Sequence, residues 1–281
     1  MHTPRWQASE IRGDEITSTV AERQDWYKMK RALSSIVGLL LILTFSGCIS
    51  GRGLNNKKPD PAAYHYQMGL SYLGERNYTA ALIDLTEAEK YNPENPEVLY
   101  HLGLALMGKR RPDLAEAKFL KAIELKPPFS VARNDLGVAY LELTRWDSAI
   151  SQFKIVKNDL FYENTESATI NLGLAYLGKG DYPKALAELQ SVASLNPRNP
   201  VVHVSMGRVY FAMDDNDRAA AEYEKALKIY GDYGAAHHYL GQVQLKQNKI
   251  EAARKSFKEA VRLIPESELG RAALGYLELI K

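Results

Sequence analysis

The only cysteine of the chain, Cys48, ends a short apolar segment and directly follows two small residues, Ser46 and Gly47. Two basic residues stand before the apolar run 32–45. Basic, apolar and small residues in this order are typical of a secretion signal and its cleavage site. The run covers 14 residues, whereas a helix that spans a membrane needs roughly 20. We therefore expect the segment to be removed. A single cysteine cannot form an intrachain disulfide or a structural zinc site.

The tetrapeptide Phe-Ser-Gly-Cys at 45–48 resembles the bacterial lipobox. The resemblance implies that Cys48 is acylated and becomes the first residue of the mature protein. Several acyl chains, at about 0.8 kcal/mol for each buried CH₂, would anchor it stably. Residues 1–28 are polar and mixed in charge, so translation is expected to start at Met29. Ile49 follows the cysteine, and by the enterobacterial sorting rule this implies the periplasmic face of the outer membrane. The alternative is a lone cysteine that happens to end an apolar stretch.

The remaining side chains that could do chemistry are six histidines and scattered polar groups. His65, His203 and His237 share one position of the repeating unit described below, which favours packing over catalysis. His237 and His238 are adjacent, so on a helix they point about 100° apart and would chelate a metal poorly. The sequence Gly-Arg-Gly at 51–53 lacks the strand and helix of a nucleotide-binding loop. We expect no enzyme, metal or cofactor, and no small-molecule substrate.

Charge and composition restrict the partner and the fold. The chain has 36 basic and 34 acidic side chains spread along its length, a formal charge of +2, so no basic stripe is left to bind nucleic acid. Apolar residues make up 46% of the chain and aromatic residues 10%, as in all-helical repeat proteins.

A repeat organises the second part of the chain. Glycines recur at intervals of 34, 34, 36, 34 and 34 residues: Gly69, Gly103, Gly137, Gly173, Gly207 and Gly241. This is the period of the tetratricopeptide repeat (TPR), a helix-turn-helix unit. An alanine follows each glycine by twelve residues: Ala81, Ala115, Ala149, Ala185, Ala219 and Ala253. We expect each glycine and alanine to meet where the two helices cross. Four repeats carry a proline expected to stop the second helix: Pro93, Pro127, Pro197 and Pro265.

The predicted fold is therefore an all-α TPR solenoid of six helix-turn-helix repeats with a C-terminal capping helix. The repeats are placed at 62–95, 96–129, 130–165, 166–199, 200–233 and 234–267, and the cap at 268–281. Residues 1–47 form the N-terminal extension and signal, and residues 48–61 the lipidated cysteine and a flexible tether.

The concave side of such a rod is lined chiefly by the first helix of each repeat. Apolar residues at its groove positions predict a protein-binding stripe: Tyr66, Leu70, Leu73, Tyr100, Leu104, Met107, Val138, Ile170 and Leu174. The corresponding positions of repeats five and six are more polar and include Val204, Arg208 and His238. The alternative, that these residues merely pack against neighbouring repeats, stays open from sequence alone.

A lipobox followed by six TPRs resembles the type IV pilus pilotin lipoproteins of the PilF/PilW type, and the likeness covers most of residues 29–281. The longer third repeat, with the extension 159–163, adds to it. The resemblance implies a protein partner, the pilus secretin, whose localisation and assembly the protein would assist. The alternative is a general periplasmic adaptor lipoprotein that docks cell-wall hydrolases or a polysaccharide export machine.

Overall fold

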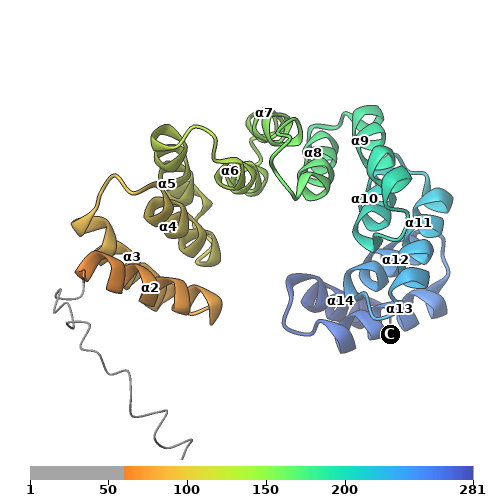
Figure 1. Cartoon of the computed structure of the whole chain (residues 1–281). Coiled ribbons are helices and arrows are strands. Elements are labelled where there is room, and N and C mark those ends of the chain that lie inside the picture. Colours follow the sequence, from red (N-terminus) through yellow and green to blue (C-terminus); the bar gives the residue numbers. More distant parts are fainter. Residues whose placement is uncertain (1–59, 281) are drawn as a thin grey trace, which may run out of the picture. The chain divides into compact units, whose positions relative to one another are not determined.

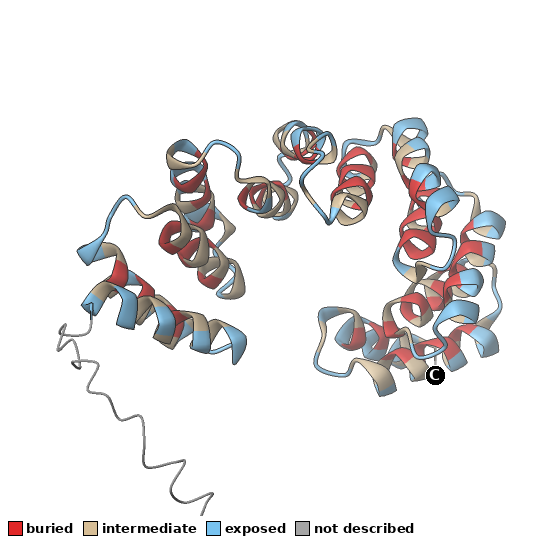
Figure 2. Cartoon of the chain, viewed as in Figure 1, coloured by how far each residue is buried: buried red, intermediate tan, exposed pale blue. Residues whose placement is uncertain are grey.

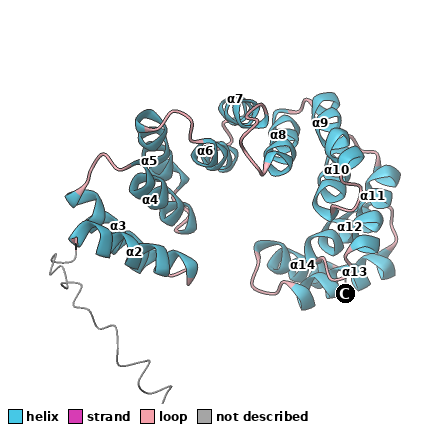
Figure 3. Ribbon diagram, viewed as in Figure 1, coloured by secondary structure: helices cyan, strands magenta, loops and turns pink. Residues whose placement is uncertain are grey.

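The computed structural model describes residues 60–280, and the fold of this part is entirely helical (Figures 1 and 3). The predicted all-α solenoid of helix pairs is confirmed. The first helices of the six pairs are α2 (Pro61–Gly74), α4 (Pro96–Gly108), α6 (Ser130–Glu142), α8 (Thr165–Lys179), α10 (Pro200–Ala212) and α12 (Gly234–Lys246). The second helices are α3 (Tyr78–Tyr91), α5 (Pro112–Leu125), α7 (Trp146–Lys157), α9 (Tyr182–Leu195), α11 (Asn216–Ile229) and α13 (Ile250–Leu263), and α14 (Glu268–Leu279) follows them.

Local sequence signals explain where several first helices begin. Helices α2, α4 and α10 each start with a proline, whose fixed φ suits the first helical position. The residue before each proline accepts a hydrogen bond from a backbone N–H of the first turn: Asp60, Asn95 and Asn199. These caps satisfy donors that have no partner inside the helix.

The turn inside each helix pair uses one left-handed residue at the same repeat position. In the fourth pair this residue is Gly180, with φ of 82°. The other five pairs place a non-glycine residue there: Arg76, Arg110, Thr144, Asp214 and Asn248. The residue after it donates a backbone hydrogen bond to the first helix, as the Asn77 N–H does to the carbonyl oxygen of Tyr72 at 2.8 Å.

The close approach inside each pair differs from the expected meeting of glycine and alanine. A Cβ on Gly69 would lie 2.5 Å from the Leu85 side chain, and one on Gly137 would lie 2.5 Å from Phe153. The glycine makes room chiefly for the large side chain four residues beyond the alanine. In the fourth pair the alanine is close as well, because a Cβ on Gly173 would lie 3.4 Å from the carbonyl oxygen of Ala185. That side chain crosses over the first helix and fills the space between the two helices.

The second helices end where the prolines predict. Helices α3, α5, α9 and α13 each end two residues before a proline. Helix α11 has no such proline and ends two residues before Gly231. Helix α7 ends earlier, at Lys157, and the segment 158–164 connects it to α8.

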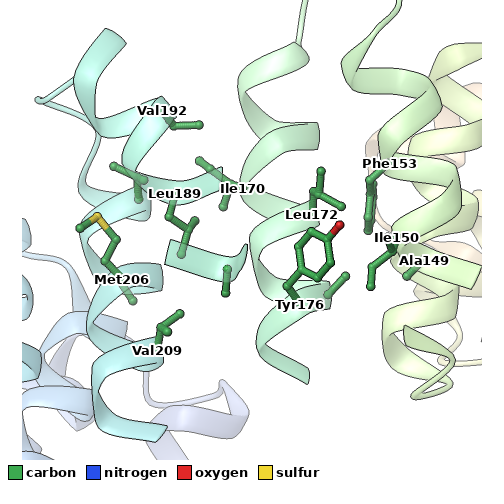
Figure 4. Packing of buried hydrophobic residues seen from close by; sticks show 14 of the residues in the cluster. Ala149, Ile150, Phe153, Ile170, Leu172, Tyr176, Leu189, Val192, Met206 and Val209 are labelled. Carbon is green, nitrogen blue, oxygen red and sulfur yellow. The ribbon is translucent and has the colours of Figure 1, made fainter. Parts of the chain in front are cut away.

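The buried residues form a series of cores along the helix stack rather than one centre (Figure 2). The largest runs from α5 to α12, and Figure 4 shows its middle, where Phe153, Leu172 and Leu189 pack between neighbouring helices. Helices pack only against helices one or two places away, as expected for a repeat array.

The predicted signal, Cys48 and most of the tether lie outside the described residues. Helix α2 already begins at Pro61, the last residue assigned to the tether. Within residues 60–280, no helix has the length and apolar character needed to cross a membrane.

Candidate functional site

The predicted apolar stripe is only partly open. Eight of its nine residues are half-buried: Tyr66, Leu70, Leu73, Tyr100, Leu104, Met107, Val138 and Leu174. Ile170 is 5% exposed and belongs to the central core, so its assignment to a binding surface is corrected (Figure 4). In Figure 4 this side chain lies toward Leu189 and Val192 of α9.

The two tyrosines of the stripe connect successive repeats. The Tyr66 hydroxyl lies 3.2 Å from Nδ1 of His101. The Tyr100 hydroxyl donates to Oδ2 of Asp135 at 2.9 Å. Burial raises the pKa of the Tyr100 hydroxyl, and the carboxylate of Asp135 raises it further. Both tyrosines are thus engaged in inter-repeat contacts with their polar ends.

Asp135 is the charged centre of this inter-repeat contact. Its carboxylate also accepts a hydrogen bond from the Asn134 side chain at 3.1 Å. Burial raises the pKa of the Asp135 carboxyl, although the hydrogen bonds from Tyr100 and Asn134 favour its charged form. This half-buried carboxylate, with donors from both sides, links repeats two and three.

The residues of repeats five and six that were expected to be the polar end of the groove are in part core residues. Val204 is 5% exposed and His238 is 2% exposed. His238 packs at 6.0 Å between ring centroids from Phe257, and burial lowers its pKa. Of the six groove positions in these repeats, Val204 and His238 are therefore core residues, whereas Arg208, Phe211, Gln242 and Leu245 are half-buried. Arg208 lines an open hollow.

The histidines at the shared repeat position are held by hydrogen bonds. Nδ1 of His65 lies 2.8 Å from Asp84, and Nδ1 of His203 lies 2.7 Å from the buried Glu222. Nε2 of His237 lies 2.9 Å from the carbonyl oxygen of Gly231. Among residues 60–280, no three His, Cys, Asp or Glu side chains come together as a metal site.

An open hollow of about 320 Å³ lies between repeats three, four and five. We call it the central hollow. Its lining comes from helices α6, α7, α8 and α10 and consists of Leu141, Glu142, Trp146, Leu174, Leu177, Gly178 and Arg208. The walls are mostly apolar, and one acidic and one basic residue stand beside them. Of the predicted stripe, Leu174 lines this hollow.

The Trp146 ring owes its position to a glycine in the next repeat. A Cβ on Gly178 would lie 2.6 Å from ring carbons of Trp146, so the ring rests directly against the backbone of α8. Tyr78 and Gly108 form the same kind of pair between repeats one and two. This aromatic and glycine pairing is a signal in the sequence that could have located Trp146.

The two charged residues of the central hollow differ from most charges on this surface. Other charges pair between adjacent repeats, as Arg145 does with Glu116 and Lys118 with Glu89. Within the described residues neither Glu142 nor Arg208 takes part in an ion pair. The Arg208 guanidinium lies 5.5 Å from the ring centroid of Tyr239, which stabilises a cation through its π face. Arg208 is therefore oriented by the protein but keeps its hydrogen-bonding capacity.

The extension between α7 and α8 exposes two apolar side chains. Leu160 and Phe161 are both 94% exposed. Asp159 shapes the segment, because its carboxylate accepts hydrogen bonds from the Ser130 hydroxyl and from the Phe161 N–H. Tyr162 turns inward, and burial followed by the charge of Asp135 raises the pKa of its hydroxyl.

A larger hollow, of about 520 Å³, lies at the turn between α10 and α11 and is lined by acidic residues. Its carboxylates are already bonded within the chain, Asp214 to Lys246, Asp215 to Arg218 and Asp217 to Gln247. The turn therefore has internal partners for its charges, and the central hollow is the stronger candidate site.

Comparison with known proteins gives both a family and individual relatives. Models of the tetratricopeptide repeat match residues 66–128, 176–223 and 204–268, which together exceed half of the chain. The type IV pilus assembly protein PilF of Pseudomonas aeruginosa is 24% identical over 172 residues, 59% of this chain and 68% of that protein.

Solved structures share the fold. PilW, described as a widely conserved type IV pilus biogenesis factor, is 18% identical with a TM-score of 0.65, over 76% of this chain and 98% of PilW. A tetratricopeptide repeat protein from Parabacteroides merdae is 17% identical with a TM-score of 0.70, over 95% of this chain and 99% of that one. At these identities the likeness establishes the architecture.

Proposed function

Because this chain belongs to the tetratricopeptide-repeat family, we propose that it is a non-catalytic adaptor that binds a protein of the type IV pilus machinery. The observation that carries the proposal is the central hollow, an apolar recess with two charged residues outside any ion pair of residues 60–280, lined mainly by the first helices of repeats three to five. The sequence likeness to PilF supports the pilus context. The partner we propose is the pilus secretin, whose localisation and ring assembly the adaptor would assist.

We further propose that the rod is attached to the periplasmic face of the outer membrane through acyl chains on Cys48. The support is the order of basic residues, apolar run and small residues before the cysteine. Mass analysis of the intact protein extracted from membranes tests the anchor. We expect a mature chain that begins at an acylated Cys48, and the Cys48→Ser variant to be unprocessed or released. An unmodified N-terminus elsewhere would exclude the anchor.

The partner is tested in a strain that lacks this gene. Secretin multimers in the outer-membrane fraction are quantified by immunoblot, with and without complementation by the wild-type chain and by Cys48→Ser. We expect multimers to be lost from the outer membrane in the deletion strain and restored by the wild-type chain alone. Normal multimers in the deletion strain, together with capture of a cell-wall hydrolase or a polysaccharide exporter by the wild-type chain, would support the general adaptor instead.

A further inference from the structure

We infer that the central hollow docks an extended segment of the partner in which a bulky apolar residue and an acidic residue stand two positions apart. The apolar side chain enters the hollow, and the acidic side chain binds Arg208. The inference rests on the proposed function only in taking the partner to be a protein. The proposed binding site therefore lies in repeats three to five, and not in the N-terminal half of the groove, where Tyr66 and Tyr100 lie.

The side chains that line the central hollow indicate that an apolar residue docks there. Leu141, Leu174 and Leu177 are half-buried and pack on the central core with one side, so the other side faces the hollow. The Trp146 ring adds an aromatic wall that rests directly against the backbone of α8, because Gly178 has no side chain. At about 320 Å³ the hollow is at the small end of ligand pockets. An open recess of this size and lining fits a large side chain of a docked chain, and aromatic walls are frequent hot spots of such contacts.

Arg208 indicates that the docked segment also carries an acidic residue. Its guanidinium stacks on Tyr239 and has no ion pair within residues 60–280. A planar guanidinium that is already oriented matches a carboxylate with little loss of side-chain freedom. Glu142, the other charge beside the hollow, repels acids, so an acidic residue is directed to the Arg208 side. Side chains two positions apart on an extended chain share one face, which sets the spacing of the motif.

The chain provides its own reporter for this site. Trp146 is the only tryptophan of residues 60–280, and the other two are Trp6 and Trp26. We would label the full chain with 5-fluorotryptophan and assign the Trp146 signal as the one that Trp146→Phe removes. Three capped heptapeptides serve as probes. The first carries Phe and Asp two positions apart, the second has Ala in place of Phe, and the third has Lys in place of Asp.

We expect the Phe and Asp peptide to shift the Trp146 signal in a saturable way, and the other two to bind at least about tenfold more weakly. Arg208→Glu should weaken the Phe and Asp peptide by about tenfold or more and reduce the preference for Asp over Lys. The matched control is Arg198→Glu, an exposed arginine at the end of the preceding repeat that does not line the hollow. Gly178→Ala should displace the Trp146 ring and weaken the peptide without changing any charge.

Three results would overturn the inference. The first is an equal shift of the Trp146 signal by the Phe and Ala peptides, and the second is equal binding of the Phe and Asp peptide by Arg208→Glu and Arg198→Glu. The third is a Trp146 signal that changes with protein concentration alone, which would mean that a second copy of the chain occupies the hollow. Capture of purified secretin, measured in parallel, separates this inference from the proposed function. If the peptide binds and secretin does not, the hollow stands and the secretin proposal fails. If secretin binds wild type and Arg208→Glu equally, the hollow fails and the secretin proposal stands.

Discussion

The groove positions of repeats one and two have a different role from those of repeats three to five. In the first region the large side chains are tyrosines whose hydroxyls reach the next repeat, Tyr66 to His101 and Tyr100 to Asp135. In the second region the residues at the same repeat position are Asn134, Ile170 and Val204, and none of them lines the central hollow. The hollow is lined instead by Leu141 and Leu177, which take the repeat position of Leu73 and Met107.

This difference shows that an apolar or aromatic residue at a groove position is not by itself a binding residue. A polar tip allows the side chain to bond to the next repeat, as Tyr66 and Tyr100 do. An aliphatic side chain at the same position has no such partner, and Ile170 and Val204 are buried in the core instead. In the first region the tyrosines therefore join successive repeats, and in the second region other residues of the first helices line an open hollow.

The largest expected effect is on stability in the first region. Tyr100→Ala should lower the free energy of unfolding by about 3 kcal/mol, because it removes a large packed ring and one of the two hydrogen bonds that the Asp135 carboxylate accepts. Leu177→Ala, at the edge of the hollow, should cost only about 1 kcal/mol. Urea unfolding followed by circular dichroism measures both. Equal losses would mean that the two regions do not differ in role.

Substitutions of two glycines, one in each region, test the same difference. Gly103 makes room for Phe119 inside its helix pair, so Gly103→Ala should destabilise by about 1–3 kcal/mol through overpacking. Gly178 is exposed and meets only the Trp146 ring from the neighbouring repeat, which can move. Gly178→Ala should therefore leave the melting temperature nearly unchanged while it shifts the Trp146 signal. A large drop in melting temperature for Gly178→Ala would show that the hollow is part of the core.

The buried carboxyl of Asp135 predicts a pH dependence in the first region. Its pKa is raised in the folded state by burial, so its contribution to stability is present when it is protonated and is lost as pH rises from about 4 through the folded pKa. The stability of wild type relative to Asp135→Asn should therefore fall over this range, by about 1.4 kcal/mol for each unit by which the pKa is raised. Urea unfolding at a series of pH values measures the difference, and parallel curves would contradict it.

The smallest expected effect concerns the turn beside the hollow. Thr144 is β-branched and has φ of 56°, a left-handed conformation that suits it poorly, whereas Gly180 occupies the same place in the next repeat. Thr144→Gly should raise the free energy of unfolding by about 0.5–1 kcal/mol, and Gly180→Thr should lower it by at least as much. Thermal melting of both variants checks the opposite signs. A loss in both would mean that the Thr144 turn is not strained.

The sequence was sufficient for the helix pairs, because their signals are local. The spacing of Gly69 and its equivalents, the Asp60-Pro61 type of helix start and the prolines after the second helices all act within one repeat. The close contact of each glycine was also predictable in kind, although its nearest neighbour is the large side chain four residues beyond the alanine. Of the four helices that line the central hollow, the predicted stripe covered α6 and α8, and of its nine residues Leu174 lines the hollow.

What only the tertiary structure decided is which side chains of those helices stay open. The burial of Ile170, the hydrogen bond from Tyr100 to Asp135, and the meeting of Trp146 with Gly178 and Arg208 join residues of different repeats. Helical periodicity assigns a residue to a face of its own helix, but packing of the next repeat determines whether that face is covered. The repeat pattern therefore fixes the scaffold, and the sizes and polar ends of side chains about one repeat apart determine where the scaffold can bind.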